Sequence, residues 1–175
     1  DTDYNRRVDE CREAATQLLQ AAGREVPEQA RFRQVPEEVY REHGETLRPE
    51  LARRAEHYFS EQRRVREGIE HWRAGDLEAY GKLVTASGRS SVHNYECGNR
   101  FMRSAFHALL EAPGVLGARF SGAGFRGCCI GLAEPGHEDE IAATALEAYR
   151  AKHPDMTDKA EVFFCRPADG AAILE

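Results

Sequence analysis

The stretch GARFSGAGFRGCC, residues 117–129, contains the residues whose types and spacing are best suited to chemistry. Its glycines at 122, 124 and 127 have the spacing G-x-G-x-x-G, which occurs in several kinds of phosphate-binding loop. Glycine has no Cβ, so an anion can approach the main chain and accept hydrogen bonds from successive backbone N–H groups. The pattern predicts an oxyanion site, and from the spacing alone a glycine-rich hairpin without a ligand is an equally good interpretation.

The residues around these glycines distinguish between the known loops. A dinucleotide-binding loop needs a helix directly after its third glycine, whereas residues 128–133 form an apolar run of strand length. A Walker loop needs Gly-Lys-Ser/Thr, and protein kinases need V-A-I-K, H-R-D and D-F-G; the sequence contains none of these. An oxidoreductase is therefore a remote alternative, and a turn between two strands remains.

Composition excludes several classes of protein. The net charge of the 175 residues is −6, whereas nucleic-acid-binding domains are normally basic. No apolar run approaches the roughly 20 residues that span a bilayer, so we expect no membrane association and a cytoplasmic location. The five cysteines form no C-x-x-C pair and the seven histidines no H-x-x-x-H pair, which argues against a metal site.

The spacing of apolar residues predicts helices over most of the first 113 residues. We expect a helix over 4–22, an irregular segment over 24–47 with a short helix near 37–42, and a long helix from Pro49 to Gly75. Asp76 is suited to cap the next helix, the residues Ser-Gly-Arg-Ser-Ser at 87–91 indicate a break, and another helix ends at Pro113. The long helix is expected to pack inside the domain through a stripe of seven residues: Leu51, Ala55, Tyr58, Gln62, Val65, Ile69 and Trp72.

The pattern changes after residue 113. Strands are predicted over 115–121 and 128–133, followed by a helix over 138–153 and a hairpin with strands over 161–165 and 171–174. We therefore predict one α+β domain over 1–175. Its helical part covers about 1–113, and about 114–175 form a β-β-α-β-β antiparallel sheet with helices on one face.

Longer motifs resemble the GHMP kinases. Residues 114–129, GVLGARFSGAGFRGCC, resemble the third motif of that family, especially of its galactokinase branch, and YNRRVDECREAA and RAEHYFSEQRRV resemble two galactokinase helices. ASGRSSVHNYECGN, residues 86–99, resembles galacturonokinases instead, as do Arg126 and the paired cysteines. The similarity covers almost the whole chain and is weakest over 24–47 and after about 153.

This resemblance implies a ferredoxin-like C-terminal domain of a sugar kinase that uses ATP and Mg²⁺. The nucleotide loop and the catalytic Asp and Arg of the family belong to an N-terminal domain, and the sequence contains no such motifs. The implied partners are that domain and a sugar or sugar acid, with galacturonate before galactose; a sugar sensor without catalysis is a further alternative. No catalytic residue is implied here, and the chain alone is expected to be inactive. The implied substrate- or phosphate-binding residues are Ser121, Gly122, Ala123, Gly124, Phe125, Arg126 and Gly127.

Two arginines are candidates to bind the carboxylate of a sugar acid. Arg126 or Arg89 is suited to a bidentate contact with the C6 carboxylate of galacturonate, although a solvated arginine is the more common interpretation. The polar residues at 93–96 are interpreted as helix caps rather than as catalytic groups. The charged residues of the helix over 49–74, Arg53 and Arg54 among them, are interpreted as a solvated face.

Overall fold

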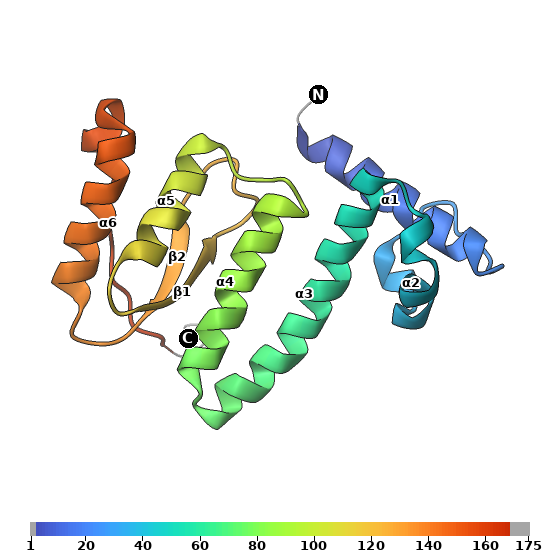
Figure 1. The fold of residues 1–175 in the computed structure, drawn as a ribbon, viewed down its shortest axis with the longest axis horizontal. Helices are drawn as coiled ribbons and strands as arrows, with labels where there is room; N and C mark the ends of the chain where they lie inside the picture. Colours follow the sequence, from blue (N-terminus) through green and yellow to red (C-terminus); the bar gives the residue numbers. More distant parts are fainter. Residues whose placement is uncertain (1–2, 169–175) are drawn as a thin grey trace, which may run out of the picture.

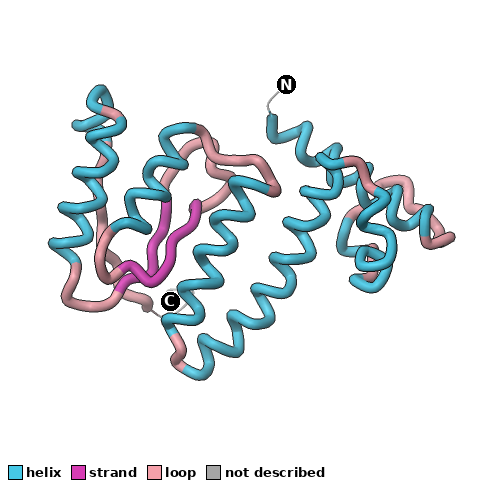
Figure 2. The backbone as a smooth tube through the Cα atoms, in the orientation of Figure 1, coloured by secondary structure: helices cyan, strands magenta, loops and turns pink. Residues whose placement is uncertain are grey.

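A computed structural model describes residues 3–168 (Figures 1 and 2). Five helices come first and are followed by a two-stranded sheet and a sixth helix, with short 3₁₀ turns between some of them. The α-helices are α1 (Asp3–Ala21), α2 (Glu37–His43), α3 (Pro49–Ala74), α4 (Leu77–His93), α5 (Arg100–Glu111) and α6 (Glu138–Lys152). The strands are β1 (Val115–Phe120) and β2 (Cys129–Ala133), and the 3₁₀ turns are Phe32–Gln34, Gly44–Thr46 and Pro154–Lys159.

The helices α3 and α4 form an antiparallel hairpin whose ends follow the sequence signals. Pro49 occupies the first turn of α3, and Gly75 ends this helix in a left-handed conformation with φ of 72°. Asp76 then accepts a hydrogen bond at 3.0 Å from the backbone N–H of Ala79 and caps α4. The predicted bounds of α3 and the predicted start of α4 are confirmed.

The apolar core has two parts, one on each side of this hairpin (Figure 1). The first joins α1, α2 and the N-terminal half of α3, where Leu18 and Leu51 have no exposed surface. The second joins the end of α4 with α5 and β1, where the rings of Phe106 and Phe120 pack edge to face with centroids 5.8 Å apart. The second core lies beneath the turn that connects the two strands.

The described strands form one antiparallel pair in which Phe120 lies opposite Cys129 and Ala118 opposite Gly131. Helix α4 packs on β1 almost backbone to backbone. A Cβ placed on Gly117 would lie 2.0 Å from the carbonyl oxygen of Gly81, so no larger residue fits at this crossing. Glycine thus sets the distance between the helix and the sheet.

The break predicted over residues 87–91 is wrong, because α4 continues through it to His93. The Ser91 hydroxyl donates to the carbonyl of Ser87, and the Ser87 hydroxyl donates to Glu61 of α3 at 2.8 Å. A Cβ on Gly88 would lie 2.6 Å from the Phe106 ring, so small residues are needed for close packing here. Tertiary contacts override the low helix propensity of these residues.

The strand predicted over 161–165 is also wrong, because residues 160–168 form no strand. The run Val162-Phe163-Phe164 lacks the alternation that would keep one face on a sheet, and the side chain of Phe163 is 78% exposed. High β-propensity does not create a strand without a partner. The strand predicted over 171–174 lies outside the described residues, so only the β-β-α part of the predicted arrangement is seen.

The stripe predicted to bury the whole length of α3 is correct only for its first half. Val65 and Trp72 are 56% and 51% exposed, and Ile69 and Leu77 are exposed as well. Val65, Ile69 and Trp72 border a groove of about 400 Å³ between the C-terminal half of α3 and α4. No helix among residues 3–168 is long and apolar enough to cross a membrane.

Candidate functional site

The turn between β1 and β2, residues 121–127, is called the glycine loop below. The backbone N–H of Ser121 donates to the carbonyl of Cys128 at 2.9 Å and closes its base. Gly122, Gly124 and Gly127 have φ angles of 87°, 73° and 106°. These are left-handed conformations that strain any residue with a Cβ, so this backbone path requires glycine at all three positions.

The backbone N–H groups inside the glycine loop have no acceptor within the described part of the chain. Within residues 3–168, none of the N–H groups of residues 122–127 donates to a backbone carbonyl or to a side chain. Most of the loop is exposed, with Gly124 buried and Phe125 half-buried. Successive free amides on a turn of this kind form a concave site for an anion.

Asn99, the N-cap of α5, holds the loop against the second core. Its backbone N–H donates to the carbonyl of Gly124 at 3.1 Å, and its side-chain amide donates to the carbonyl of Phe125 at 2.6 Å. Its side-chain oxygen accepts from the N–H of Met102 at 2.9 Å. Two carbonyls of the loop are therefore fixed from inside, while its N–H groups are left without internal partners.

The two candidate arginines are exposed and have no internal partner. Among residues 3–168, neither Arg126 in the glycine loop nor Arg89 on α4 forms an ion pair or a side-chain hydrogen bond. Arg119, in contrast, is half-buried and donates to the carbonyl of Phe120. Whether either exposed guanidinium binds a substrate stays a prediction.

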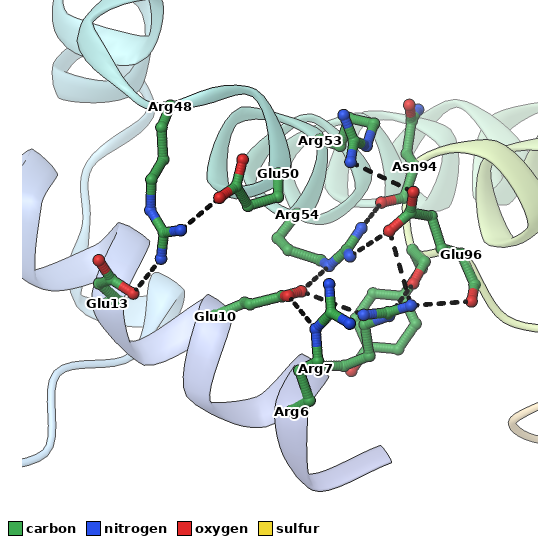
Figure 3. A network of polar contacts seen from close by, with 11 residues as sticks. Arg6, Arg7, Glu10, Glu13, Arg48, Glu50, Arg53, Arg54, Asn94 and Glu96 are labelled. Carbon is green, nitrogen blue, oxygen red and sulfur yellow. Dashed lines mark hydrogen bonds and ion pairs between the residues drawn. The ribbon is translucent and has the colours of Figure 1, made fainter. Parts of the chain in front are cut away.

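Arg54 was predicted to be solvated, and this is wrong: its side chain is completely buried. Its Nε donates to Glu10 of α1 at 2.7 Å, one terminal nitrogen donates to Glu96 at 2.5 Å, and the other donates to the carbonyl of Asn94 (Figure 3). The hydrogen bond from Arg54 lowers the pKa of Glu96 below its ordinary value of 4.5. One signal was present in the sequence, because Arg54 lies three residues after Leu51 on the buried side of α3.

The polar residues at 93–96, interpreted from the sequence as helix caps, lie at the C-terminal end of α4. Asn94 is the C-cap of α4, and the carbonyls of residues 94 and 95 accept hydrogen bonds from Arg54 and Arg7. Cations are favourable at the C-terminal end of a helix, where carbonyls lack partners. The cap of α5 is Asn99.

Comparison with known proteins identifies the family. Residues 65–151 match the family model of the C-terminal domain of GHMP kinases. The chain carries the C-terminal domain of the GHMP kinases. This match includes the glycine loop and both strands, so the resemblance seen in the sequence is confirmed.

Curated relatives of the chain are sugar kinases. The chain is 45% identical to a galacturonokinase of Arabidopsis thaliana, over 98% of its own length and 41% of that relative. It is 33% identical to a galactokinase of Lacticaseibacillus casei strain BL23, over 99% of the chain and 43% of that relative. The chain thus spans about two fifths of the length of these relatives.

A solved structure shares the fold of the GHMP kinase domain. The crystal structure of Lactococcus lactis galactokinase complexed with galactose superposes with a TM-score of 0.74 at 25% identity. The alignment covers 87% of this chain and 38% of the galactokinase. The predicted α+β class is confirmed.

Two pockets lie along α3, and the glycine loop lines neither. The larger, about 580 Å³, lies between α1 and α3 and is lined by His57, Tyr95 and the buried Arg54. Burial lowers the pKa of His57, whose Nδ1 lies 2.9 Å from the hydroxyl of Ser90. Residues 3–168 contain no cluster of three His, Cys, Asp or Glu side chains that could hold a metal ion.

Proposed function

We propose that this GHMP kinase domain forms the C-terminal wall of the active-site cleft of an ATP-dependent sugar kinase. The glycine loop would face the sugar and the phosphoryl group that is transferred to its anomeric hydroxyl. The observation that carries this proposal is the set of backbone N–H groups at 122–127 that lack internal acceptors. We also propose a cytoplasmic location, because the proposed reaction uses ATP.

Phosphoryl transfer needs positioning and charge stabilisation more than covalent help from the protein. The anomeric oxygen forms a bond to the γ-phosphorus, the bond from that phosphorus to the ADP oxygen breaks, and the hydroxyl proton goes to a base. Fixed N–H groups stabilise the negative charge on the transferred group without having to reorganise. The glycine loop offers such groups and contains no base, so we assign the base to the N-terminal domain of the complete protein.

That N-terminal domain is also the proposed partner that binds most of the ATP and Mg²⁺. The described residues have no cluster suited to a metal, and the glycine loop lies on the surface rather than in a closed pocket. A calorimetric titration of ATP into the 175-residue chain is therefore expected to give negligible heat. Micromolar binding would contradict the assignment of the nucleotide site to the other domain.

We propose D-galacturonate as the sugar, with D-galacturonate 1-phosphate as the product. The higher identity to a galacturonokinase, 45% against 33% for a galactokinase, supports this choice over galactose. The exposed guanidinium of Arg126 lies within the glycine loop and has no internal partner. Arginine binds carboxylates with two parallel hydrogen bonds, which a neutral hydroxymethyl group cannot accept in the same way.

The test uses the complete gene product with ATP and either galacturonate or galactose. Arg126→Ala is expected to lower kcat/KM for galacturonate by about tenfold or more, as loss of a charge-assisted pair does. Its effect on galactose should be less than about twofold, and Arg126→Lys should be intermediate. Arg41→Ala is the matched control, because Arg41 is also exposed and has no ion pair within residues 3–168.

An equal loss on both sugars would remove the role of Arg126 in substrate choice. Preferential turnover of galactose would favour the galactokinase alternative. Binding of either sugar without any transfer of phosphate from ATP would instead favour a sugar sensor that has the fold without the catalysis.

A further inference from the structure

We propose that Arg54 and Glu96 are positioning residues that hold the glycine loop in place through the segment 94–99. This inference rests on the proposed function only in so far as the loop is the part of the domain that meets the substrate. Neither Arg54 nor Glu96 contacts the loop directly. Arg54 binds the start of the segment, Glu96 lies within it, and Asn99 at its end contacts the loop.

The segment is held at its start by buried arginines. The guanidinium of Arg54 has no exposed surface and uses its fork of donors on Glu10, on the carbonyl of Asn94 and on the carboxylate of Glu96. Arg7 adds hydrogen bonds to the carbonyls of residues 95 and 96. Three successive carbonyls after the end of α4 therefore accept hydrogen bonds from two arginines. Removing a partner of a buried charge destabilises the folded state, so these contacts hold the segment in place.

Glu96 is held in an unusual backbone conformation. Its φ is 56°, and among residues 3–168 no other residue except glycine has a positive φ. Such a conformation in a non-glycine residue persists when the surroundings enforce it. Here the carboxylate of Glu96 contacts Arg54 at 2.5 Å, Arg53 at 3.2 Å and Arg7 at 3.6 Å (Figure 3).

The end of the segment holds the glycine loop. Gly98 lies against the Phe120 ring, where a Cβ would be 2.6 Å from a ring carbon, and its carbonyl accepts from Arg103. Asn99 then donates to the carbonyls of Gly124 and Phe125. Only two residues separate the strained Glu96 from Asn99, so the position of the loop depends on the turn that the arginines fix.

The alternative is that this buried network only joins α1 to α3. The two roles differ in what a mild change at Glu96 does. Glu96→Gln removes the negative charge but keeps the shape, and the side chain is 34% exposed, so the variant should fold. Glu13→Gln is the matched control, because Glu13 also forms an ion pair between elements, with Arg48 at 2.6 Å, but contacts no part of the segment 94–99 (Figure 3).

The first readout is amide hydrogen exchange of the 175-residue chain by NMR. The amides of Asn99 and Ser121 report on the loop, because they donate to Gly124 and Cys128. Glu96→Gln should speed their exchange by about tenfold relative to the amides of α6, since local opening is enough to expose them. Arg54→Lys should do the same, and Glu13→Gln should not. Equal changes in the loop and in α6, or none, would overturn the positioning role.

The second readout is kinetic and uses the complete gene product. Glu96→Gln should lower kcat for sugar phosphorylation about tenfold with a smaller change in KM for the sugar, because a displaced loop is misaligned with the transition state. Faster exchange with unchanged kcat would overturn the link to the reaction. The exchange result does not depend on any activity, so the positioning role and the proposed function can fail separately.

Discussion

Gly81 of α4 and Gly117 of β1 lie with their backbones in direct contact. A Cβ on Gly81 would lie 2.4 Å from the carbonyl oxygen of Leu116, and one on Gly117 would lie 2.0 Å from the carbonyl oxygen of Gly81. Both obstacles are backbone atoms, which cannot rotate away as a side chain can. This crossing fixes the distance of α4 from β1, the strand that leads into the glycine loop.

Gly117→Ala is therefore expected to destabilise the domain by about 3 kcal/mol, at the upper end of the usual cost of overpacking. Urea unfolding of the 175-residue chain measures this difference. Gly131→Ala is the control, because Gly131 is exposed on β2 and its nearest neighbour would be 3.7 Å from a new Cβ. Similar free energies of unfolding for the two variants would contradict the close packing of α4 on β1.

Asn99 has two roles that different substitutions separate. Asn99→Asp keeps the oxygen that accepts from Met102 but removes the amide that donates to Phe125, so it should cost about 1 kcal/mol of stability, a typical net hydrogen bond. Asn99→Ala removes both contacts and should cost about 2 kcal/mol. Thermal or urea unfolding of the two variants gives the order. Equal losses would mean that the cap contact with Met102 adds nothing, and an Asp variant as stable as wild type would mean that the contact with the loop adds nothing.

The bounds of the helices could be predicted because the signals that end a helix are local. Pro49, Gly75 and Asp76 act on the backbone within a few residues of themselves, and each has the predicted role in the structure. The position of the glycine loop was also predictable, since a backbone path with positive φ angles at three residues requires glycine at each of them. Local signals fail over 87–91, where the helix is sustained by close packing against β1 and Phe106.

The position of Arg54 on the buried side of α3 could be read from its spacing to Leu51, but its partners could not be predicted, because they are remote in sequence. Glu10 lies 44 residues before it and Glu96 lies 42 residues after it. A pattern of mixed charges on a helix is the same whether an arginine faces water or a buried carboxylate. The strand expected over 161–165 fails for a related reason, since a strand depends on a partner that its own residues do not specify.

The cap of α4 offers a further test of a local signal. Asp76→Ala should cost about 1 kcal/mol, because the N–H of Ala79 loses its acceptor at the start of the helix. Asp76→Asn is the control: it keeps a capping oxygen and removes only the exposed contact with His71. The loss should be visible in urea unfolding, and a larger loss for the Asn variant than for the Ala variant would contradict a capping role.

The pH dependence of stability should report the burial of His57. Burial lowers the pKa of His57 below 6.5, despite the opposing charge of Glu61. The unfolded chain therefore binds this proton more readily than the folded one, and protonation favours unfolding. Stability from this group is complete above pH 6.5, declines as the pH falls below that value, and stops declining below the folded pKa. The variant His57→Gln should lack this decline, because its side chain stays neutral.

The measurement is the free energy of urea unfolding of wild type and His57→Gln at several pH values between 7 and 5, and the quantity of interest is their difference. The carboxylates of Glu10 and Glu96 do not disturb it, since their arginine partners lower both pKa values below 4.5 and both groups stay ionised throughout. The free energy of unfolding of wild type minus that of His57→Gln should decrease steadily as the pH falls below 6.5. A constant difference would show that His57 has the same proton affinity in the folded and unfolded chains, and would contradict its partial burial on α3 beside the ring of Tyr95.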